Sequence, residues 1–203
     1  MKFVLASHNQ KKIEEVAAIL AALGIQLVSA DIGGDIPETG ATFAENARMK
    51  AKTVMERTGL AAIADDSGLC VSALGGAPGV HSARYGGDAS FTDRDRNRLL
   101  LQNMRSVPAG QRTAQFCCSI ACCFPDGREL TVSGECQGEI LAEEAGKGGF
   151  GYDPLFYVPE YGKTFGELPP EVKNRISHRA RALAKLREAL EEMLEGEQNY
   201  DKQ

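Results

Sequence analysis

Apolar residues recur every three or four positions in several stretches of the chain, and this spacing predicts helices. In the first stretch, the pattern starts after Asn9, a residue suited to capping a helix, and stops at Gly24. Before the second stretch, Thr42 and Glu45 have the spacing of a capping box, in which two side chains bond the backbone at a helix start. We expect helices over residues 10–23, 43–57, 92–105 and 178–194.

Shorter apolar or alternating runs predict strands. Residues 112–124 alternate with a period of two, and the turn sequence 125–127 follows, so this run should form a hairpin with residues 128–138. A strand–helix–strand start followed by a hairpin indicates an α/β fold, with a mixed β-sheet and flanking helices. The other expected strands are 2–6, 25–29 and 60–64, and residues 69–74 are expected to be extended.

The remaining segments and the composition narrow the class of protein. The length of 203 residues suits a single domain over 1–203, in which 31–40 and 146–151 are loops and 195–203 is a frayed polar tail. The net charge of −5 argues against a nucleic-acid binder, which needs a basic face. Apolar runs are too short for a membrane span or a signal peptide, so we expect no membrane association and a cytoplasmic location.

Six cysteines raise the question of a zinc site or of disulfides. Four of them lie in the alternating run 112–124, where neighbours such as Cys117 and Cys118 face opposite sides of a strand. Cys118 and Cys122 lie four residues apart, which is about 13 Å along a strand. Neither pair can share one metal ion, so we expect buried free thiols in a reducing compartment.

A pair of acidic residues follows the predicted strand 60–64. Ligands of open α/β sheets gather outside the carboxyl ends of the strands, which is where Asp65 and Asp66 are expected. Adjacent carboxylates repel each other, and a cation would offset that repulsion. Mg2+ suits the place because it binds carboxylate and phosphate oxygens, and Glu38 in the preceding loop could join it. An Asx-type turn that leaves the strand is the alternative.

Two segments carry groups that suit phosphates. Residues 7–12 stand where a strand turns into a helix, so backbone N–H groups there favour an anion, and Lys12 adds a positive charge. Asn46 and Lys50 are four residues apart on one helix face, from which Lys50 could reach a phosphate. An ordinary helix cap and solvated lysines explain the same residues without a ligand.

Two further segments, 146–151 and 173–179, suit a nucleobase. The first is a glycine-rich loop beside aromatic and acidic residues, which can stack on a base and accept a hydrogen bond from its edge. The second is basic and can donate to a base carbonyl. A plain surface loop and a solvated basic turn are the alternatives. The side chains concerned are Phe150, Tyr152, Asp153, His178 and Arg179.

Taken in order, these motifs resemble the inosine triphosphate, or XTP/dITP, pyrophosphatases, which clear non-standard purine nucleotides. The resemblance covers nearly the whole chain, and the ordered set is specific although each motif alone is weak. Family members often have Thr and Gly before the asparagine, where this chain has Ser7 and His8, which makes the turn bulkier. The matching segments are 7–12, 43–51, 64–69, 75–85, 148–156 and 176–179.

The resemblance implies hydrolysis of ITP, dITP or XTP to the monophosphate and pyrophosphate with Mg2+, by a homodimer of elongated, two-lobed subunits with a central cleft. It implies that Asp66 takes the proton of water and contacts the metal, with Glu38 as second ligand; whether Asp65 shares the metal instead stays open. The implied phosphate-side residues are Ser7, His8, Asn9, Gln10, Lys11, Lys12, Lys50 and Ser67. The implied base-side residues are Phe150, Gly151, Tyr152, Asp153, Lys173, His178 and Arg179.

Three other functions fit parts of the chain. Residues 66–68 have the Asp-Ser-Gly form of an aspartic-protease motif, but that fold is mostly β and needs two such loops that face each other. A nucleotide or RNA sensor without turnover would use the basic stretch 173–181. A pyrophosphatase for another modified nucleotide is the third alternative.

Overall fold

The structure, a computed structural model, describes residues 1–6, 10–28, 34, 36–88 and 90–200, with the backbone alone for 10–12, 15 and 197–200. Its strands are β1 (Lys2–Leu5), β2 (Gln26–Val28), β3 (Ala61–Val71), β4 (Thr113–Cys123), β5 (Glu129–Ile140), β6 (Phe156–Val158) and β7 (Lys163–Thr164). Its helices are α1 (Gln10–Ala22), α2 (Phe43–Thr58), α3 (Asp93–Asn103), α4 (Pro170–Ile176) and α5 (His178–Tyr200), with the 3-10 turns η1 (Ser72–Leu74) and η2 (Gly79–Arg84).

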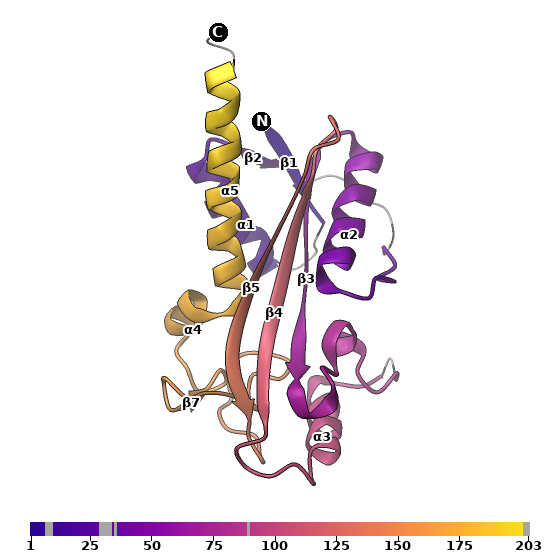
Figure 1. Cartoon of the computed structure of the whole chain (residues 1–203), viewed down its shortest axis with the longest axis vertical. Helices are drawn as coiled ribbons and strands as arrows, with labels where there is room; N and C mark the ends of the chain where they lie inside the picture. Colours follow the sequence, from indigo (N-terminus) through magenta and orange to yellow (C-terminus); the bar gives the residue numbers. More distant parts are fainter. Residues whose placement is uncertain (7–9, 29–33, 35, 89, 201–203) are drawn as a thin grey trace. The chain divides into compact units, whose positions relative to one another are not determined.

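The described strands form one seven-stranded sheet in the order β2-β1-β3-β4-β5-β6-β7. Strand β1 runs parallel to β2 and β3, whereas β6 runs antiparallel to β5 and β7. The predicted α/β fold with a mixed sheet and flanking helices is therefore confirmed (Figure 1).

The chain divides into two compact units. Unit 1 comprises Met1–Asp66, Cys118–Gly134 and Arg181–Gln203, and unit 2 comprises Ser67–Cys117 and Glu135–Ala180. Strands β3, β4 and β5 and helix α5 contribute residues to both units. Each unit has an apolar core of its own, so each is described separately below.

In unit 1, successive strand residues point into two different apolar layers, as the period of two requires. Phe3 and Ile63 pack with α1 and α5, while Val4 and Ala62 pack with Val54 of α2. Figure 1 shows α1 and α5 on one side of these strands and α2 on the other. Unit 1 is thus a helix–sheet–helix sandwich, and this arrangement holds α2 against the first half of β3.

In unit 2, aromatic side chains from β4, β6 and the end of β7 form the core with helix α3. The ring of Phe116 lies 4.6 Å from that of Phe156 and 5.8 Å from that of Phe165, measured between centroids. Leu100 and Met104 at the end of α3 are fully buried in the same cluster. This core fixes α3 beside the segment that follows β5.

Local end signals correctly predicted the starts of α2 and α3. Thr42 and Glu45 form the expected capping box of α2, and Thr92 and Asp95 form that of α3. Helix α2 ends at Gly59, which has a left-handed backbone with φ of 67°.

Three expectations about element ends are wrong. The expected strand 60–64 does not end before Asp65 but continues through it to Val71, and residues 72–74 turn into η1 instead of staying extended. Helix α4 is absent from the expected helices; it begins at Pro170, a residue that suits the first helical position because no N–H is needed there. Helix α5 runs to Tyr200 rather than ending at residue 194.

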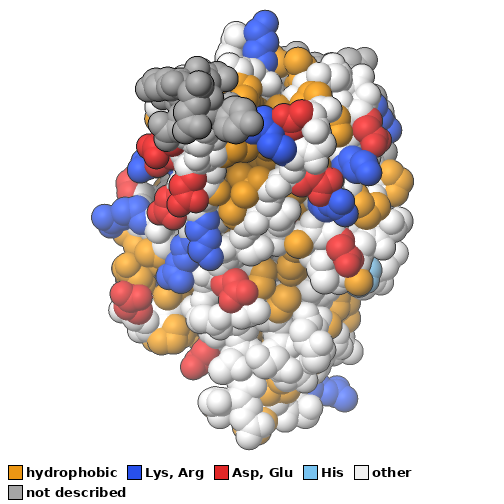
Figure 2. Space-filling model, turned by 45° about the horizontal axis from the view of Figure 1, so that its top comes forward, with side chains coloured by type: hydrophobic (Ala, Val, Ile, Leu, Met, Phe, Trp, Pro, Cys, Tyr) orange, Lys and Arg blue, Asp and Glu red, His pale blue; other side chains and the backbone are white. Residues whose placement is uncertain are grey.

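The cysteines agree with the expectation of buried free thiols. All six cysteines are free thiols, and five of them are buried. Within the described ranges, no helix is long and apolar enough to cross a membrane. On the face drawn in Figure 2, the acidic and basic side chains are interspersed.

Candidate functional site

A charged cluster in unit 1 brings together three residues that the sequence suggested for a metal–phosphate site. The Nζ atom of Lys50 lies 2.7 Å from Oε1 of Glu38 and 3.7 Å from Oδ1 of Asp66. The Lys50 side chain is 15% exposed and that of Asp66 is 10% exposed, so little water screens their attraction. One lysine thus neutralises part of the charge of two carboxylates that come from different segments.

Asn46 orients the carboxylate of Asp66. Its Nδ2 donates to Oδ2 of Asp66 at 3.0 Å, while its Oδ1 accepts from the backbone N–H of Gly40 at 2.8 Å. A Cβ atom at Gly40 would lie 2.8 Å from that Oδ1, so the close approach requires glycine. Asn46 therefore ties the loop before α2 to β3, a role that its spacing from Lys50 hinted at but did not specify.

The acidic cluster fits a divalent metal ion shared with a substrate better than a preformed metal cage. Among the residues that the structure describes, no three His, Cys, Asp or Glu side chains lie close enough to hold a metal ion. Mg2+ is usually bound by one or two carboxylates together with phosphate oxygens and water. The oxygens of Asp66 and Glu38 on either side of Lys50 meet this need. Asp65 is also buried on the same strand.

A second group of charged and aromatic residues lies in unit 2. The buried Oδ2 of Asp153 accepts from the backbone N–H of Phe150 at 2.7 Å and from Nζ of Lys173 at 2.5 Å. The same Nζ lies 4.7 Å from the ring centroid of Phe150, a cation–π contact. The Phe150 residue is 60% exposed, so its ring offers a face for stacking while its backbone is fixed.

Glycine is required in the loop before Asp153. Gly149 has φ of +77°, and a Cβ atom there would lie 2.1 Å from Oδ2 of Asp153. Gly146 has φ of +87°, and its Cβ would lie 2.3 Å from the backbone of Gly166. The glycine-rich stretch noticed in the sequence thus serves close packing around a carboxylate.

Besides Asp153, two of the expected base-side residues, Tyr152 and His178, are buried. The ring of His178 stacks on Phe116 with centroids 4.9 Å apart and an angle of 14°. The hydroxyl of Tyr152 donates to the carbonyl of Ser82 at 2.9 Å, and burial raises the pKa of Tyr152 above its usual range. The Tyr152 side chain therefore supports the unit 2 core. Arg179 is partly buried at the start of α5, where the Ser177 hydroxyl accepts from the Ala180 N–H, as expected of a cap.

The structure describes only some of the other residues that are expected to bind phosphates. Residues 7–9, which include Ser7, His8 and Asn9, lie outside the described residues. The backbone of Gln10, Lys11 and Lys12 forms the start of α1, and their side chains are not described. Ser67 is a half-buried residue of β3. The structure thus brings together one group in unit 1 (Glu38, Asn46, Lys50, Asp66) and another in unit 2 (Phe150, Asp153, Lys173).

Comparison with known proteins decides the family. The family model described as "Ham1 family" matches residues 3–189. The chain belongs to the Ham1 family. Proteins named dITP/XTP pyrophosphatase are similar over nearly their whole length: one from Geobacter sulfurreducens is 51% identical over 192 residues, which are 93% of this chain and 96% of the relative. One from Thermus thermophilus is 53% identical over 191 residues, which are 93% and 91% of the two chains.

Solved structures agree with this assignment. The structure of a HAM1 protein from Coxiella burnetii has a TM-score of 0.89 and 43% sequence identity, and it covers 95% of this chain and 99% of that chain. The Staphylococcus aureus Ham1 protein also has a TM-score of 0.89, at 38% identity, with 95% and 100% of the chains covered. The resemblance drawn from the ordered motifs is confirmed.

Proposed function

We propose that this chain hydrolyses non-standard purine nucleoside triphosphates (ITP, dITP and XTP) to the monophosphate and pyrophosphate. The observation that carries the proposal is the cluster of Lys50 with Glu38 and Asp66 in a Ham1 family chain. Relatives about half identical over nearly the full length are named dITP/XTP pyrophosphatases, which supports this substrate class. The enzyme would be a nucleoside triphosphate pyrophosphohydrolase.

Asp66 is the proposed catalytic residue. Water adds to phosphorus, the anhydride bond between the α- and β-phosphates breaks, and the proton of the water passes to the Asp66 carboxylate. Asn46 donates to Oδ2 of this carboxylate and orients it, while Oδ1 lies 3.7 Å from Nζ of Lys50. A positioned carboxylate base contributes about 10²–10⁴-fold to a rate.

Magnesium is the proposed cofactor, with Asp66 and Glu38 as the residues that would hold it. When bound, Mg2+ neutralises charge on the triphosphate and on the departing pyrophosphate. Lys50, which pairs with both carboxylates, would then be free to turn toward phosphate oxygens. The other proposed phosphate contacts are Ser7, His8, Asn9, Gln10, Lys11, Lys12 and Ser67.

The base side is proposed to lie on unit 2. Phe150 would stack on the purine, and Asp153 and Lys173 would form hydrogen bonds to its edge. A 6-oxo purine presents an acceptor to the Lys173 ammonium, whereas adenine presents an amino group there and leaves this donor unpaired, which rejects adenine strongly. The remaining proposed base contacts are Gly151, Tyr152, His178 and Arg179.

We further propose that residues 1–203 act as a single pyrophosphatase domain, that the protein is a cytoplasmic homodimer, and that it binds neither nucleic acid nor a membrane. Light scattering after size-exclusion chromatography tests the dimer, since the subunit mass is 21.8 kDa. A mass near that value would exclude the homodimer.

A panel of nucleoside triphosphates, each assayed with and without Mg2+ for pyrophosphate and for orthophosphate, tests the function. We expect pyrophosphate from dITP, ITP and XTP, little from dATP, and none without the metal. Asp66→Asn should abolish turnover and leave the circular dichroism spectrum unchanged. Tight binding of dITP without pyrophosphate release would mean that the chain is a nucleotide sensor, and orthophosphate as the product would mean another hydrolase.

A further inference from the structure

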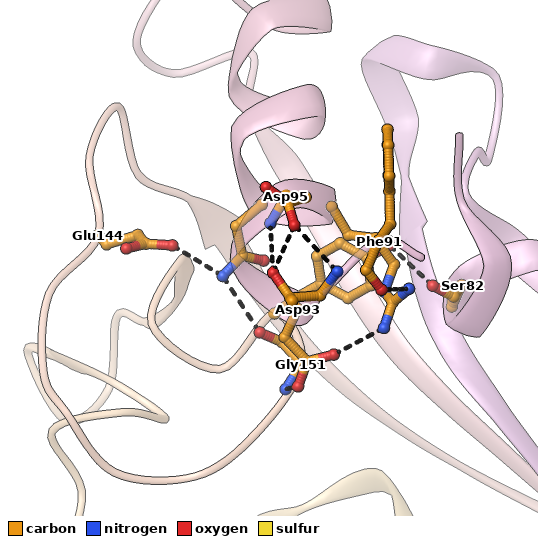
Figure 3. A network of polar contacts seen from close by, with 10 residues as sticks. Ser82, Phe91, Asp93, Asp95, Glu144 and Gly151 are labelled. Carbon is orange, nitrogen blue, oxygen red and sulfur yellow. Dashed lines mark hydrogen bonds and ion pairs between the residues drawn. The ribbon is translucent and has the colours of Figure 1, made fainter. Parts of the chain in front are cut away.

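Helix α3 holds both backbone groups of Gly151, the residue next to the exposed Phe150. The Gly151 N–H donates to Oδ2 of Asp93 at 2.8 Å, and the Gly151 carbonyl accepts from Nδ2 of Asn97 at 3.2 Å. Asp93 and Asn97 are four residues apart and therefore lie on one face of the helix. Figure 3 shows Gly151 beside Asp93, with Glu144 approaching from the other side.

Asn97 makes this anchor specific. It is 2% exposed, and its Nδ2 also donates to Oε1 of Glu144 at 2.9 Å. Because both partners are acceptors, the amide nitrogen must face them, and the orientation of the side chain is fixed. Within the part of the chain that the structure describes, Oδ1 of Asn97 then has no hydrogen-bond partner, which costs stability. An apolar residue of similar size would pack here without that cost, so packing alone does not explain why the residue is an asparagine. Its two hydrogen bonds, to the Gly151 carbonyl and to Glu144, do explain it.

The helix face that supplies the anchor is itself fixed. Arg96 pairs with Oδ1 of Asp93 at 3.1 Å and donates to the carbonyl of Phe91 at 2.7 Å. The capping box of Thr92 and Asp95 closes the start of α3 (Figure 3). The α3 side chains that bind the Gly151 backbone are therefore held in place by the start of the helix, and α3 in turn positions the loop.

We propose that Asn97, supported by Asp93, is a positioning residue for base recognition. It holds the Gly151 backbone so that the Phe150 ring and the Asp153 carboxylate are presented in one arrangement before a purine arrives. Ordering a binding loop in advance strengthens binding, because less conformational freedom is lost when the ligand binds. This inference rests on the proposed function, since it assumes that Phe150 and Asp153 contact the base.

A fluorescence experiment tests the anchor without relying on activity. The chain contains no Trp, so Phe150→Trp introduces a single reporter at the loop. Time-resolved anisotropy of this variant should show slow local motion, and adding Asn97→Ala should increase the fast component. The matched control adds Asp95→Ala instead, which weakens the start of α3 but leaves the Gly151 bonds in place.

Kinetics test the consequence for recognition in the native background. Asn97→Ala should raise KM for dITP roughly 10-fold, which is the change expected when one or two hydrogen bonds are removed, and should change kcat less than about 3-fold. Inorganic tripolyphosphate has no base, so its inhibition constant should stay the same. Asp93→Ala should raise KM less than Asn97→Ala because Asp93 is half exposed, and Asp93→Asn, which keeps an acceptor oxygen, should restore the wild-type value.

The outcomes separate this inference from the proposed function. If the wild-type protein releases no pyrophosphate from dITP, the proposed function fails, and the anisotropy still reports whether Asn97 orders the loop. If the wild-type protein is active but Asn97→Ala leaves KM unchanged, or weakens tripolyphosphate binding equally, Asn97 is not a positioning residue. An equal effect of Asp95→Ala on anisotropy or KM would also overturn the inference.

Discussion

Replacing the buried Asn46 by Leu removes two hydrogen bonds at the centre of the charged cluster while keeping a similar volume. The variant leaves Oδ2 of Asp66 without its 3.0 Å donor and the Gly40 N–H without its 2.8 Å acceptor. A buried bond to a charged group contributes roughly 1.5–3 kcal/mol and a neutral one roughly 0.5–1.5 kcal/mol. We therefore expect Asn46→Leu to lower the free energy of unfolding by about 2–4 kcal/mol.

Urea unfolding followed by far-UV circular dichroism measures this loss. With a slope of about 2 kcal/mol per molar urea, the midpoint should fall by about 1–2 M. The kcat for dITP should fall as well, because the proposed base Asp66 loses the donor that orients it.

The matched control is Asn103→Leu, the same chemical change at an exposed helix residue that donates to the Tyr85 hydroxyl. Surface substitutions of this kind change stability by less than about 0.5 kcal/mol. If Asn46→Leu shifts the midpoint no more than Asn103→Leu does, the bonds of Asn46 do not stabilise the cluster and the reasoning is wrong.

Three further predictions concern other parts of the molecule. Lys173→Met should lower the free energy of unfolding by about 3–5 kcal/mol, as expected when a buried ion pair loses one partner. The variant should also narrow the preference for dITP over dATP, and an unchanged ratio of the two kcat/KM values would exclude base reading by Lys173. The Cys117 hydrogen bond lowers the pKa of the half-buried Cys70, whereas burial raises the pKa of Cys122, so iodoacetamide should modify Cys70 first; peptide mapping that found Cys122 first would contradict this. Because burial raises the pKa of Tyr152, its hydroxyl loses a proton above about pH 10 in unfolded chains, while folded chains keep the proton. The free energy of unfolding should therefore decline as the pH rises past about 10. In urea titrations at alkaline pH, Tyr152→Phe should make this decline smaller.

Local signals in the sequence predicted the starts of α2 and α3, and long-range contacts decided where β3 ends. A capping box such as that of Thr42 involves two residues one turn apart, so it can be read from sequence alone. Residues 65–68 have low intrinsic strand preference, yet β3 continues through them. The bond from Asn46, twenty positions earlier, satisfies the Asp66 carboxylate there, and no local pattern contains that information.

The same distinction holds for the site. The sequence indicated Lys50, Glu38 and Asp66 as candidates, because charged residues beside loops and strand ends suggest phosphate and metal binding. The anchor of Asn97 on Gly151 joins residues more than fifty positions apart and has no motif, so no feature of the sequence singled it out. Supporting residues of this kind become visible only once the packing is known.

In the proposed function, one group of residues acts on the phosphates and the other reads the base, and kinetics can resolve these two tasks. Glu38, Lys50 and Asp66 in unit 1 are charged groups without an aromatic surface, which suits their proposed contacts with the metal and the phosphates. Phe150, Asp153 and Lys173 in unit 2 combine a ring with a donor and an acceptor, which is what an edge-reading base site needs. Variants of the first group should therefore lower kcat equally for every base, whereas variants of the second should change KM and the ranking of bases. If Asp66→Glu altered the ranking of dITP over dATP, or Lys173→Met lowered kcat for both alike, the two tasks would not be separate.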